Sequence, residues 1–498
     1  MNITEQLVEA AERAPEQAAI VFEGRTLRYA DLNRAASQVA EMIGEWGLAP
    51  GDRVALLLPN IPEFAITCLG AQKFGAVVVS LNIMLRSAEL AYALRDCGAR
   101  ALFTTEAALR EIEPIRSQLP ELLHIVVCEG NATAWAESLS ELRRGRPGLA
   151  RPCAREPSDP AAILYTSGTT GNPKGAVLSH GNLLSNAAST QHCVGSRPGD
   201  RHLLFLPLSH CFGQNFILHT AIRSLGTVVL ERRYELQATL ADIQRHEVSH
   251  FYGVPTNYIY LLDAGVERAQ LSSVRFFFSA AATMPREIAQ SWRERFGTPI
   301  YEGYGLTETA PLATYNHLHS YRAGSVGTAI PGVELKVVAD GGRVCDAGEW
   351  GEICIKGPNV MSGYYQREEA TREAIRDGWF HSGDIGYRDA DGYYYLVDRQ
   401  KDMINCAGYK VWPREVEEVL YQHAAVAECA VVGFADPIKG ERVVAFVRLK
   451  PGATPDSADL RGYCEARSAR YKVPAEFVFD REIPKSPSGK ILKRVLRG

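Results

Sequence analysis

Residues 165–175, YTSGTTGNPKG, have the composition of a loop that binds a polyphosphate. The segment holds three glycines, four serine or threonine hydroxyls and Lys174. Backbone N–H groups that glycine leaves accessible, hydroxyl donors and one ammonium together match the oxygens of a phosphate chain. A surface hairpin built on Gly-Asn-Pro rarely needs so many hydroxyls and a lysine, so we interpret the segment as a phosphate site.

The spacing within this segment differs from that of the common P-loop. A Walker A motif has a glycine, four residues and then Gly-Lys-Ser/Thr, and it opens a helix. Here Lys174 lies between a proline and a glycine, and apolar segments at 161–164 and 176–179 flank the loop. The pattern predicts strand, loop and strand, which argues against a P-loop kinase or GTPase.

Residues 304–308, YGLTE, carry a second set of groups suited to a nucleotide. Tyr304 offers a flat ring for a base and Thr307 a hydroxyl for a phosphate. Glu308 offers a hard oxygen ligand of the kind that Mg²⁺ prefers. Taken alone, five residues could equally be the start of a helix.

Three more charged residues follow at wide intervals, and each is weak evidence by itself. Asp384 follows a glycine, as turn residues often do. Arg399 lies in the charged run 398–402, which alone reads equally well as a solvated turn. Lys490 ends the segment 483–490, IPKSPSGK, and a lysine near a terminus is usually solvated.

These segments, in this order, resemble the adenylate-forming superfamily of acyl-CoA synthetases, peptide-synthetase adenylation domains and luciferases. The resemblance covers essentially the whole chain. It implies that Tyr304 stacks on the adenine of ATP, that Thr307 meets the α-phosphate and that Glu308 holds Mg²⁺ with help from Thr166. It also implies that the loop grips the β- and γ-phosphates through Thr166, Ser167, Gly168, Thr169, Thr170, Gly171 and Lys174.

The same resemblance implies roles for the later charged residues. Asp384 and Arg399 would bind the ribose, and Lys490 would bridge the carboxylate substrate and the α-phosphate. Attack of a carboxylate on a phosphoryl group brings two anions together, so a positioned ammonium and Mg²⁺ offset the repulsion. A carboxylate is already ionised at pH 7, so the reaction needs no general base.

The resemblance places the acyl pocket around residues 210–216 and 279–284. Its expected lining is His210, Phe212, Phe216, Ala281 and Gly305, although His210 could instead be a core histidine. The family often has glycines after Ser279, so the methyls of Ala280 and Ala281 should narrow or reshape this pocket. Residues 210–216 contain no acid to hold an α-amino group, which favours an apolar aliphatic or aromatic acid. Gln214 and Asn215 either face the pocket or pack elsewhere.

The acceptor of the acyl group is expected to be coenzyme A. The family layout implies two half-reactions, with a small C-terminal domain that rotates about Lys401 and exchanges Lys490 for Gly408. An amide ligase that passes the same adenylate to an amine is the alternative, a carrier-protein thiol is a further acceptor, and a luciferase would need only pocket changes. A catalytically inactive protein that senses a nucleotide or an acyl group is disfavoured, because Lys490, Glu308 and Arg399 are all present.

The elements that must position these residues alternate along the chain. Helical spacing at 32–46, 61–74, 87–97 and 182–190 alternates with apolar strands at 53–58, 76–81, 202–206 and 274–279. This predicts an α/β protein with doubly wound, largely parallel sheets. Short strands between 325 and 398 predict an antiparallel or barrel-like subregion. We expect an adenylation domain at 1–398 and a small α+β lid domain at 399–498.

Composition bounds the remaining possibilities. The chain has 498 residues and a net charge of −4, which gives no basic footprint for nucleic acid. The apolar window 64–81 is interrupted by Gln72 and Lys73, so we expect a buried helix and strand and no membrane span. The eleven scattered cysteines and the acidic N-terminus favour the reducing cytosol over secretion. Neither a monomer nor a homodimer is excluded.

Overall fold

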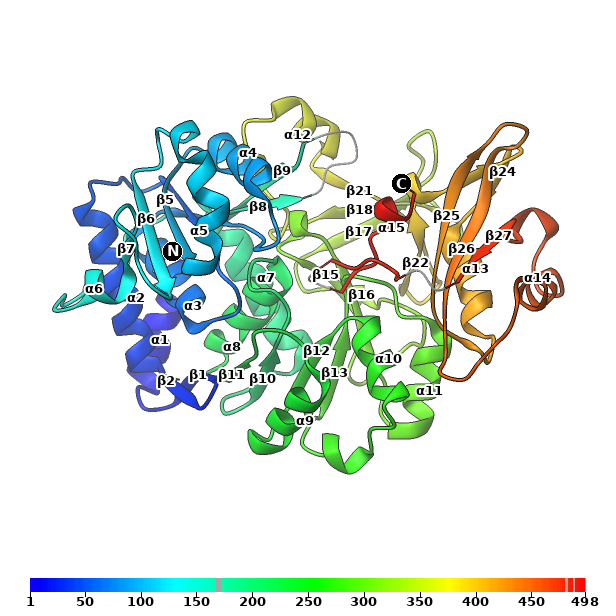
Figure 1. Ribbon diagram of the computed structural model, residues 1–498, viewed down its shortest axis with the longest axis horizontal. Coiled ribbons are helices and arrows are strands. Elements are labelled where there is room, and N and C mark those ends of the chain that lie inside the picture. The colour runs from blue at the N-terminus through cyan, green and yellow to red at the C-terminus, as the bar shows by residue number, and fades with distance from the viewer. Residues whose placement is uncertain (167–171, 480–481, 487–488, 498) are drawn as a thin grey trace.

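The protein consists of two large sheets with helices around them, a curled antiparallel sheet and a small C-terminal domain (Figure 1). The computed structural model describes residues 1–166, 172–479, 482–486 and 489–497. The first sheet lies at the N-terminal end of the long axis and the C-terminal domain lies at the other end. The predicted α/β architecture with a barrel-like subregion is confirmed.

The first sheet has eight strands in the order β19-β9-β8-β4-β3-β5-β6-β7. Its strands are parallel from β8 to β7, whereas β9 and β19 are added antiparallel at the other edge. The strands are β3 (Arg53–Leu56), β4 (Val77–Ser80), β5 (Ala99–Thr105), β6 (His124–Glu129), β7 (Glu137–Ser138), β8 (Pro160–Thr166), β9 (Lys174–Ser179) and β19 (Gly363–Tyr364).

The second sheet has nine strands in the order β16-β15-β14-β13-β12-β10-β11-β1-β2. Its centre, from β1 to β14, is parallel and its outermost strands are antiparallel. The strands are β1 (Ala18–Phe22), β2 (Arg25–Arg28), β10 (Arg201–Leu204), β11 (Thr227–Leu230), β12 (His250–Gly253), β13 (Phe276–Ser279), β14 (Tyr301–Gly305), β15 (Leu312–Tyr315) and β16 (Thr328–Ala329).

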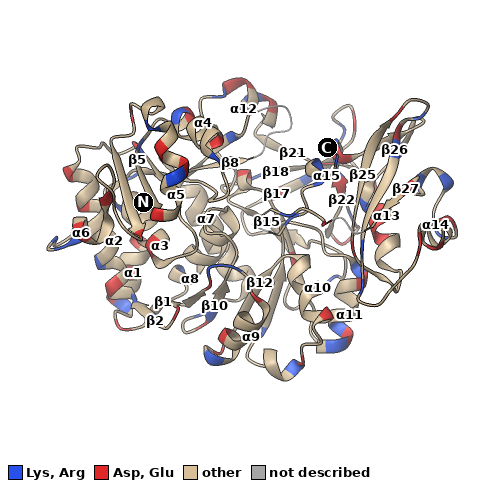
Figure 2. Cartoon of the chain, viewed as in Figure 1, with Lys and Arg blue, Asp and Glu red and all other residues tan. Residues whose placement is uncertain are grey.

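Helices cover these sheets, and basic and acidic residues are interspersed along them (Figure 2). The α-helices of this part are α1 (Glu5–Arg13), α2 (Tyr29–Glu45), α3 (Pro62–Phe74), α4 (Ser87–Cys97), α5 (Glu106–Ile112), α6 (Leu139–Arg143), α7 (His180–Val194), α8 (Thr220–Arg223), α9 (Leu236–Arg245), α10 (Pro255–Asp263), α11 (Arg286–Phe296) and α12 (Glu368–Ala374). Shorter turns of helix are η1 (Glu113–Gln118), the π-helix η2 (Phe212–His219), η3 (Arg268–Leu271) and η4 (Thr307–Thr309).

Helix α3 shows why one apolar window does not imply a membrane span. Pro62 starts the helix, where a missing N–H costs nothing, and Gly75 ends it in the left-handed conformation at φ 97°. Nearly every side chain of α3 is buried, because α2 and the first sheet surround it. Among the described residues, no helix is both long and apolar enough to cross a bilayer.

The curled sheet is antiparallel and carries two of the predicted ligand-binding residues. Its strands are β17 (Glu334–Val338), β18 (Gly351–Lys356), β20 (Ile375–Arg376), β21 (Trp379–Arg388) and β22 (Tyr394–Arg399). The register between β21 and β22 pairs Asp384 with Arg399, although fifteen residues separate them along the chain.

The C-terminal domain has its own sheet and its own core. The sheet contains β23 (Ile404–Cys406), β24 (Tyr409–Val411), β25 (Val426–Asp436), β26 (Gly440–Leu449) and β27 (Glu476–Val478), and η5 (Gln400–Asp402) precedes it. One face packs on α13 (Pro413–Tyr421) and α14 (Ser457–Glu465), and η6 (Arg470–Lys472) follows α14. Ile483 and Leu496, the latter in α15 (Lys493–Leu496), cover the other face, so the last segment of the chain closes this core.

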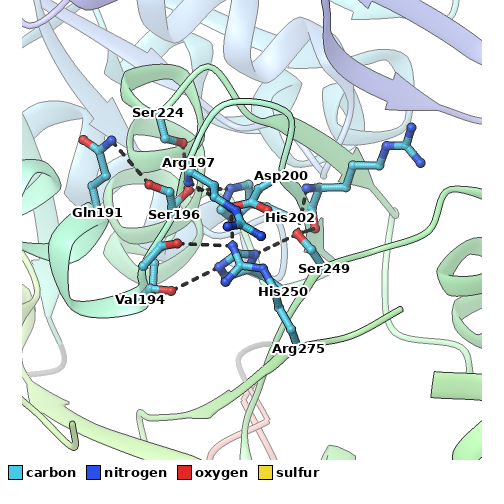
Figure 3. Close-up of polar contacts among 12 residues, drawn as sticks. Gln191, Val194, Ser196, Arg197, Asp200, His202, Ser224, Ser249, His250 and Arg275 are labelled. Atoms are coloured by element: carbon cyan, nitrogen blue, oxygen red, sulfur yellow. Dashed lines mark hydrogen bonds and ion pairs between the residues drawn. The ribbon is translucent and has the colours of Figure 1, made fainter. Parts of the chain in front are cut away.

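A buried polar network ties the central strands of the nine-stranded sheet together (Figure 3). His202 on β10 lies opposite His250 on β12, and their rings stack with centroids 4.6 Å apart. Ser196 lies 3.0 Å from Nε2 of His202, and Ser249 lies 2.9 Å from Nδ1 of His250. Burial lowers the pKa of His250 to about 3 and places that of His202 well below its usual value, so both rings are neutral.

Candidate active site

A cavity of about 510 Å³ lies between the carboxyl ends of β13 and β14, the curled sheet and the last segment of the chain. Ligands of open α/β sheets bind at this end of the strands. Seven residues that the sequence singled out line the cavity: Ala281, Tyr304, Gly305, Asp384, Arg399, Lys401 and Lys490. Segments that are far apart in the sequence therefore meet at one site.

Strand β14 delivers the residues of the YGLTE segment. Gly305 is required there, because a Cβ at this position would lie 1.7 Å from the carbonyl oxygen of Pro311. The chain then turns into η4, which carries Thr307 and Glu308. The hydroxyl of Tyr304 donates to Oδ2 of Asp384 at 2.7 Å. Burial and the Asp384 carboxylate hold the pKa of Tyr304 well above its ordinary value, so the hydroxyl remains a donor.

Asp384 and Arg399 form an ion pair on the cavity wall. Nε of Arg399 lies 3.1 Å from Oδ1 of Asp384, and the carboxylate is buried. Oδ1 thus faces Arg399 and Oδ2 faces Tyr304. The pair fixes the orientation of a carboxylate whose free lone pairs suit the hydroxyls of a sugar.

Glu352 on β18 supports the turn that presents Asp384. Its Oε1 accepts from the backbone N–H of Gly383 at 2.9 Å, and its Oε2 lies 2.7 Å from Nδ1 of His381. Ser382 accepts from the N–H of Asp384 and donates to the carbonyl of Ile353 on β18. No sequence pattern pointed to Glu352, because only the pairing of β18 with β21 brings it to this turn.

Glu352, His381 and Cys354 also place three potential metal ligands within 4.8 Å of one another. The Oε2 of Glu352 is already occupied by His381, and Nη2 of Arg376 lies 3.8 Å from the same oxygen. A cation at this oxygen would displace a hydrogen bond and face a guanidinium. We therefore interpret the group as support for Asp384.

Glu308 meets the phosphate-loop strands on the far side of η4. Its Oε1 accepts from the hydroxyl of Tyr364 at 2.9 Å and from Oγ1 of Thr166 at 3.4 Å. Strands β8 and β9 pair Thr166 with Lys174, as the predicted strand, loop and strand require. Nζ of Lys174 lies 5.3 Å from the centre of the Tyr364 ring. Ser167, Gly168, Thr169, Thr170 and Gly171 lie outside the described residues.

The oxygens at this point fit a hard divalent cation. A buried carboxylate and a hydroxyl, 3.4 Å apart, are ligands of the type that Mg²⁺ takes, with waters and phosphate oxygens completing its shell. Tyr364 is a residue that sequence reasoning missed. Its only signal is structural, since the pairing of β19 with β9 brings it beside the loop.

Lys490 lies in the cavity beside the Asp384–Arg399 pair. Burial lowers the pKa of Lys490 to about 8, and the positive charge of Arg399 contributes. The group remains mostly protonated at pH 7. His210 is near enough to feel this charge: burial, together with Lys490, lowers the pKa of His210 to about 4. The N–H of Phe212 donates to Nδ1 of His210, so the neutral ring carries its proton on Nε2.

The predicted acyl-pocket residues divide into two groups. Ala281 and Gly305 line the cavity, and Ala281 adopts a left-handed φ of 67°, a conformation that favours the glycine seen in related motifs. Phe212 and Phe216 are buried away from it, where Phe216 stacks on Phe278 with ring centroids 4.9 Å apart. Asn215 and Gln214 pack elsewhere: they donate to the carbonyl of Ala310 and to Cys68.

Gly408 lies outside the cavity, in the exposed hairpin between β23 and β24. Lys401, in η5 at the start of the C-terminal domain, borders the cavity instead. The structure therefore holds the arrangement in which Lys490 is at the site and Gly408 is away from it.

Glu302 is a second wall residue that the sequence did not single out. It is buried, and its Oε1 has no hydrogen-bond partner within the described ranges. Burial raises the pKa of Glu302 to about 7. It precedes Gly303 and Tyr304 on β14, and its unpartnered oxygen is itself covered by the protein.

Comparison with known families agrees with this site. The model of the AMP-binding enzyme family matches residues 7–365, and that of the AMP-binding enzyme C-terminal domain matches residues 415–490. The long-chain-fatty-acid–CoA ligase of Bacillus subtilis (strain 168) is 34% identical over 98% of this chain and 93% of its own length. The sulfoacetate–CoA ligase of Cupriavidus necator is 38% identical over 94% of this chain and 91% of its own.

Solved structures show the same fold with ligands of the expected kind. The anthranilate CoA ligase AuaEII in complex with anthranoyl-AMP superposes with a TM-score of 0.93 at 31% identity, over 100% of this chain and 96% of that one. ATP-bound MatB from Rhodopseudomonas palustris superposes with a TM-score of 0.92 at 30% identity, over 100% of this chain and 98% of that one. The acceptor that the sequence left open is therefore CoA. The chain belongs to the adenylate-forming superfamily of AMP-binding enzymes and is an AMP-forming acid–CoA ligase that acts through an acyl-adenylate.

Proposed function

We propose that the enzyme activates an apolar carboxylic acid, aliphatic or aromatic, with release of pyrophosphate, and then transfers the acyl group to CoA. The observation that carries this proposal is the convergence of Tyr304, Asp384, Arg399 and Lys490 on one cavity. These residues come from β14, β21, β22 and the last segment, so their convergence reflects the assembled fold.

In the first half-reaction the acid's carboxylate attacks the α-phosphorus of ATP and pyrophosphate leaves. The ammonium of Lys490 lies between the two anions and stabilises the negative charge that grows on the α-phosphoryl oxygens. Thr307, at the start of η4, donates its hydroxyl to the same phosphate. Lys174 and Thr166 hold the leaving pyrophosphate.

The nucleoside is held by residues of the cavity wall. Tyr304 offers its ring face to adenine, while Asp384, braced by Arg399, accepts hydrogen bonds from the ribose hydroxyls. Glu308 and Thr166 would hold Mg²⁺, which supplies electrostatic stabilisation of the phosphates when bound.

Transfer to CoA requires a different placement of the C-terminal domain. We propose a boundary between residues 398 and 399 and a hinge at Lys401, in the short turn η5. Rotation there would withdraw Lys490 and bring Gly408, exposed at its hairpin, to the site. A glycine lets the pantetheine arm approach the backbone closely.

The apolar character of the acid rests on the residues around the acyl side of the cavity. Ala281, a small apolar residue, lines it, and residues 210–216 contain no acid that could pair with a charged group on the substrate. The relatives include a long-chain-fatty-acid–CoA ligase and a sulfoacetate–CoA ligase, so they do not define one substrate class. The substrate class proposed here is therefore inferred from the residues of this chain.

A screen of pyrophosphate release over carboxylic acids tests this proposal directly. Straight-chain, branched, aromatic and sulfonated acids would be compared at fixed ATP and Mg²⁺, and mass spectrometry would identify the CoA thioester. We expect an apolar acid to give the highest kcat/KM. Preference for sulfoacetate or another charged short acid would refute the proposed substrate class.

A further inference from the structure

One face of α10 meets a buried charge cluster of the C-terminal domain. Glu428, on β25, is 2% exposed. Nζ of Lys485 lies 2.9 Å from its Oε2, and Nε of Arg448 lies 3.4 Å from the same oxygen. We call these three residues the Glu428 cluster. A buried carboxylate is tolerated when it is paired and hydrogen-bonded in this way.

Three residues of α10 contact this cluster from the large domain. Oγ1 of Thr256 donates to Oε1 of Glu428 at 3.3 Å. The hydroxyl of Tyr260 lies 3.4 Å from Nζ of Lys485, which also lies 5.4 Å from the centre of its ring. Oδ2 of Asp263 lies 4.0 Å from Nη2 of Arg448. Positions separated by four and three residues share one side of a helix, so we call Thr256, Tyr260 and Asp263 the α10 docking face.

Backbone contacts of described residues link the cluster to Lys490. Lys485 and Ile491 form a bridge, and the N–H of Ser486 donates to the carbonyl of Lys490 at 2.8 Å. Gly489, at φ 79°, passes so close to Val254 that a Cβ would lie 2.5 Å from its Cγ2. Val254 is the N-cap residue of α10 and immediately precedes Pro255. The helix and its N-cap therefore contact the segment before Lys490 at two points, Lys485 and Gly489.

We propose that the α10 docking face, through the Glu428 cluster, sets how long Lys490 occupies the cavity and thereby the balance between adenylation and thioester formation. This rests on the proposed exchange of Lys490 for Gly408. All three contacts join the large domain to the C-terminal domain, so rotation about Lys401 would break them together. The pairs inside the cluster belong to the C-terminal domain and would persist. The contacts therefore stabilise only the arrangement competent for adenylation, and their loss lowers its population.

The test separates the two half-reactions in variants of the docking face. The double variant Thr256→Val, Asp263→Asn removes two cross-domain contacts and leaves the Glu428 cluster intact. At saturating ATP we expect kcat for pyrophosphate release to fall about three- to tenfold, the combined scale of one long hydrogen bond and one partly exposed ion pair. Thioester formation from pre-made acyl-adenylate and CoA should be unchanged or faster.

Two matched variants serve as controls. The single variant Thr256→Ser keeps the hydroxyl donor, so its rate of pyrophosphate release should lie within about twofold of that of the parent enzyme. Glu267→Gln removes an exposed carboxylate just beyond α10 and should change neither half-reaction. Hydrogen exchange of residues 489–492 should become faster in the double variant only.

Equal loss in both half-reactions of the double variant, or no loss in either, would overturn the role of the docking face. The underlying exchange is tested separately by Lys490→Ala. If that variant loses both half-reactions equally, the exchange itself is wrong. If it loses adenylation alone while the double variant shows equal loss, only the docking face is wrong.

Discussion

Lys490 carries the largest predicted effect of any single residue, because in the proposed reaction its buried ammonium is the donor that faces the α-phosphate. Lys490→Ala should slow pyrophosphate release by about two to three orders of magnitude, the cost of removing one donor aimed at the developing charge. Thioester formation from acyl-adenylate should be spared. Rapid-quench assays of the two half-reactions check this.

The lowered pKa of Lys490 gives its role a pH signature. The ammonium is the active form and its pKa is about 8, so kcat/KM for pyrophosphate release should fall as pH rises through that value. Lys490→Arg keeps its charge to much higher pH. Its profile should stay flat where the parent enzyme declines, whatever its absolute rate. Parallel profiles for the two enzymes would contradict this assignment.

Glu352 is expected to act on ATP binding through the turn that carries Asp384. Glu352→Gln weakens the acceptor for the N–H of Gly383 and changes the partner of His381. KM for ATP should rise about three- to tenfold, as loss of one charge-assisted hydrogen bond predicts, with a smaller change in kcat. Glu349→Gln, at an exposed carboxylate just before β18, is the control. A fall in kcat with no change in KM would argue against a role in presenting Asp384.

At the scale of elements, η5 lies at the proposed junction of the two domains. The turn is three residues long and Lys401 lies at its centre. Proline fixes φ near −65° and constrains the residue before it. Lys401→Pro should therefore keep adenylation and slow transfer to CoA by at least about tenfold. Burst kinetics with accumulated acyl-adenylate would show this, whereas unaffected transfer would remove the argument for rotation at this residue.

The elements themselves follow closely from local sequence. Helix α4 has the bounds that the pattern predicts, 87–97, and Gly98 ends it in the left-handed conformation. Helix α3 begins at Pro62, one residue after the predicted start. The π-helix η2 has no such local marker, because it packs among α7, α8 and the nine-stranded sheet.

At the scale of the whole molecule, the paired histidines of the nine-stranded sheet make stability depend on pH. His202 and His250 are neutral in the folded protein, with the pKa of His250 near 3, whereas an unfolded histidine titrates near 6.5. Below about pH 6.5 the unfolded chain binds protons that the folded chain does not. Stability should fall with falling pH by about 1.4 kcal/mol per pH unit for each ring.

Urea unfolding at pH 7.5, 6.0 and 5.0 measures this dependence. His250→Asn removes one titrating ring, so its stability should decline less steeply with acidification than that of the parent. Both proteins contain the same carboxylates, so the contribution of these groups to the pH dependence cancels in the comparison. These carboxylates include Asp200, which pairs with Arg275 beside the network (Figure 3). Equal slopes of stability against pH would show that His250 does not contribute to the pH dependence.

The expectations of a cytosolic location and of a possible homodimer remain predictions. All eleven cysteines lie within the described residues, and none forms a disulfide there. The domain boundary at 398/399 also remains a prediction, to which the separate core of the C-terminal domain lends support.

The sequence by itself indicated the chemistry, because the phosphate loop, the YGLTE segment, Asp384, Arg399 and Lys490 occur together in the order typical of the adenylate-forming superfamily. Only the tertiary structure decided which residues support them. Glu352, Tyr364 and Glu302 reach the site through strand pairing and burial, which no local spacing encodes. The tertiary structure also decided that Lys490 lines the cavity while Gly408 does not. The contacts of α10 with the Glu428 cluster join residues more than 160 positions apart, so no local pattern could predict this placement.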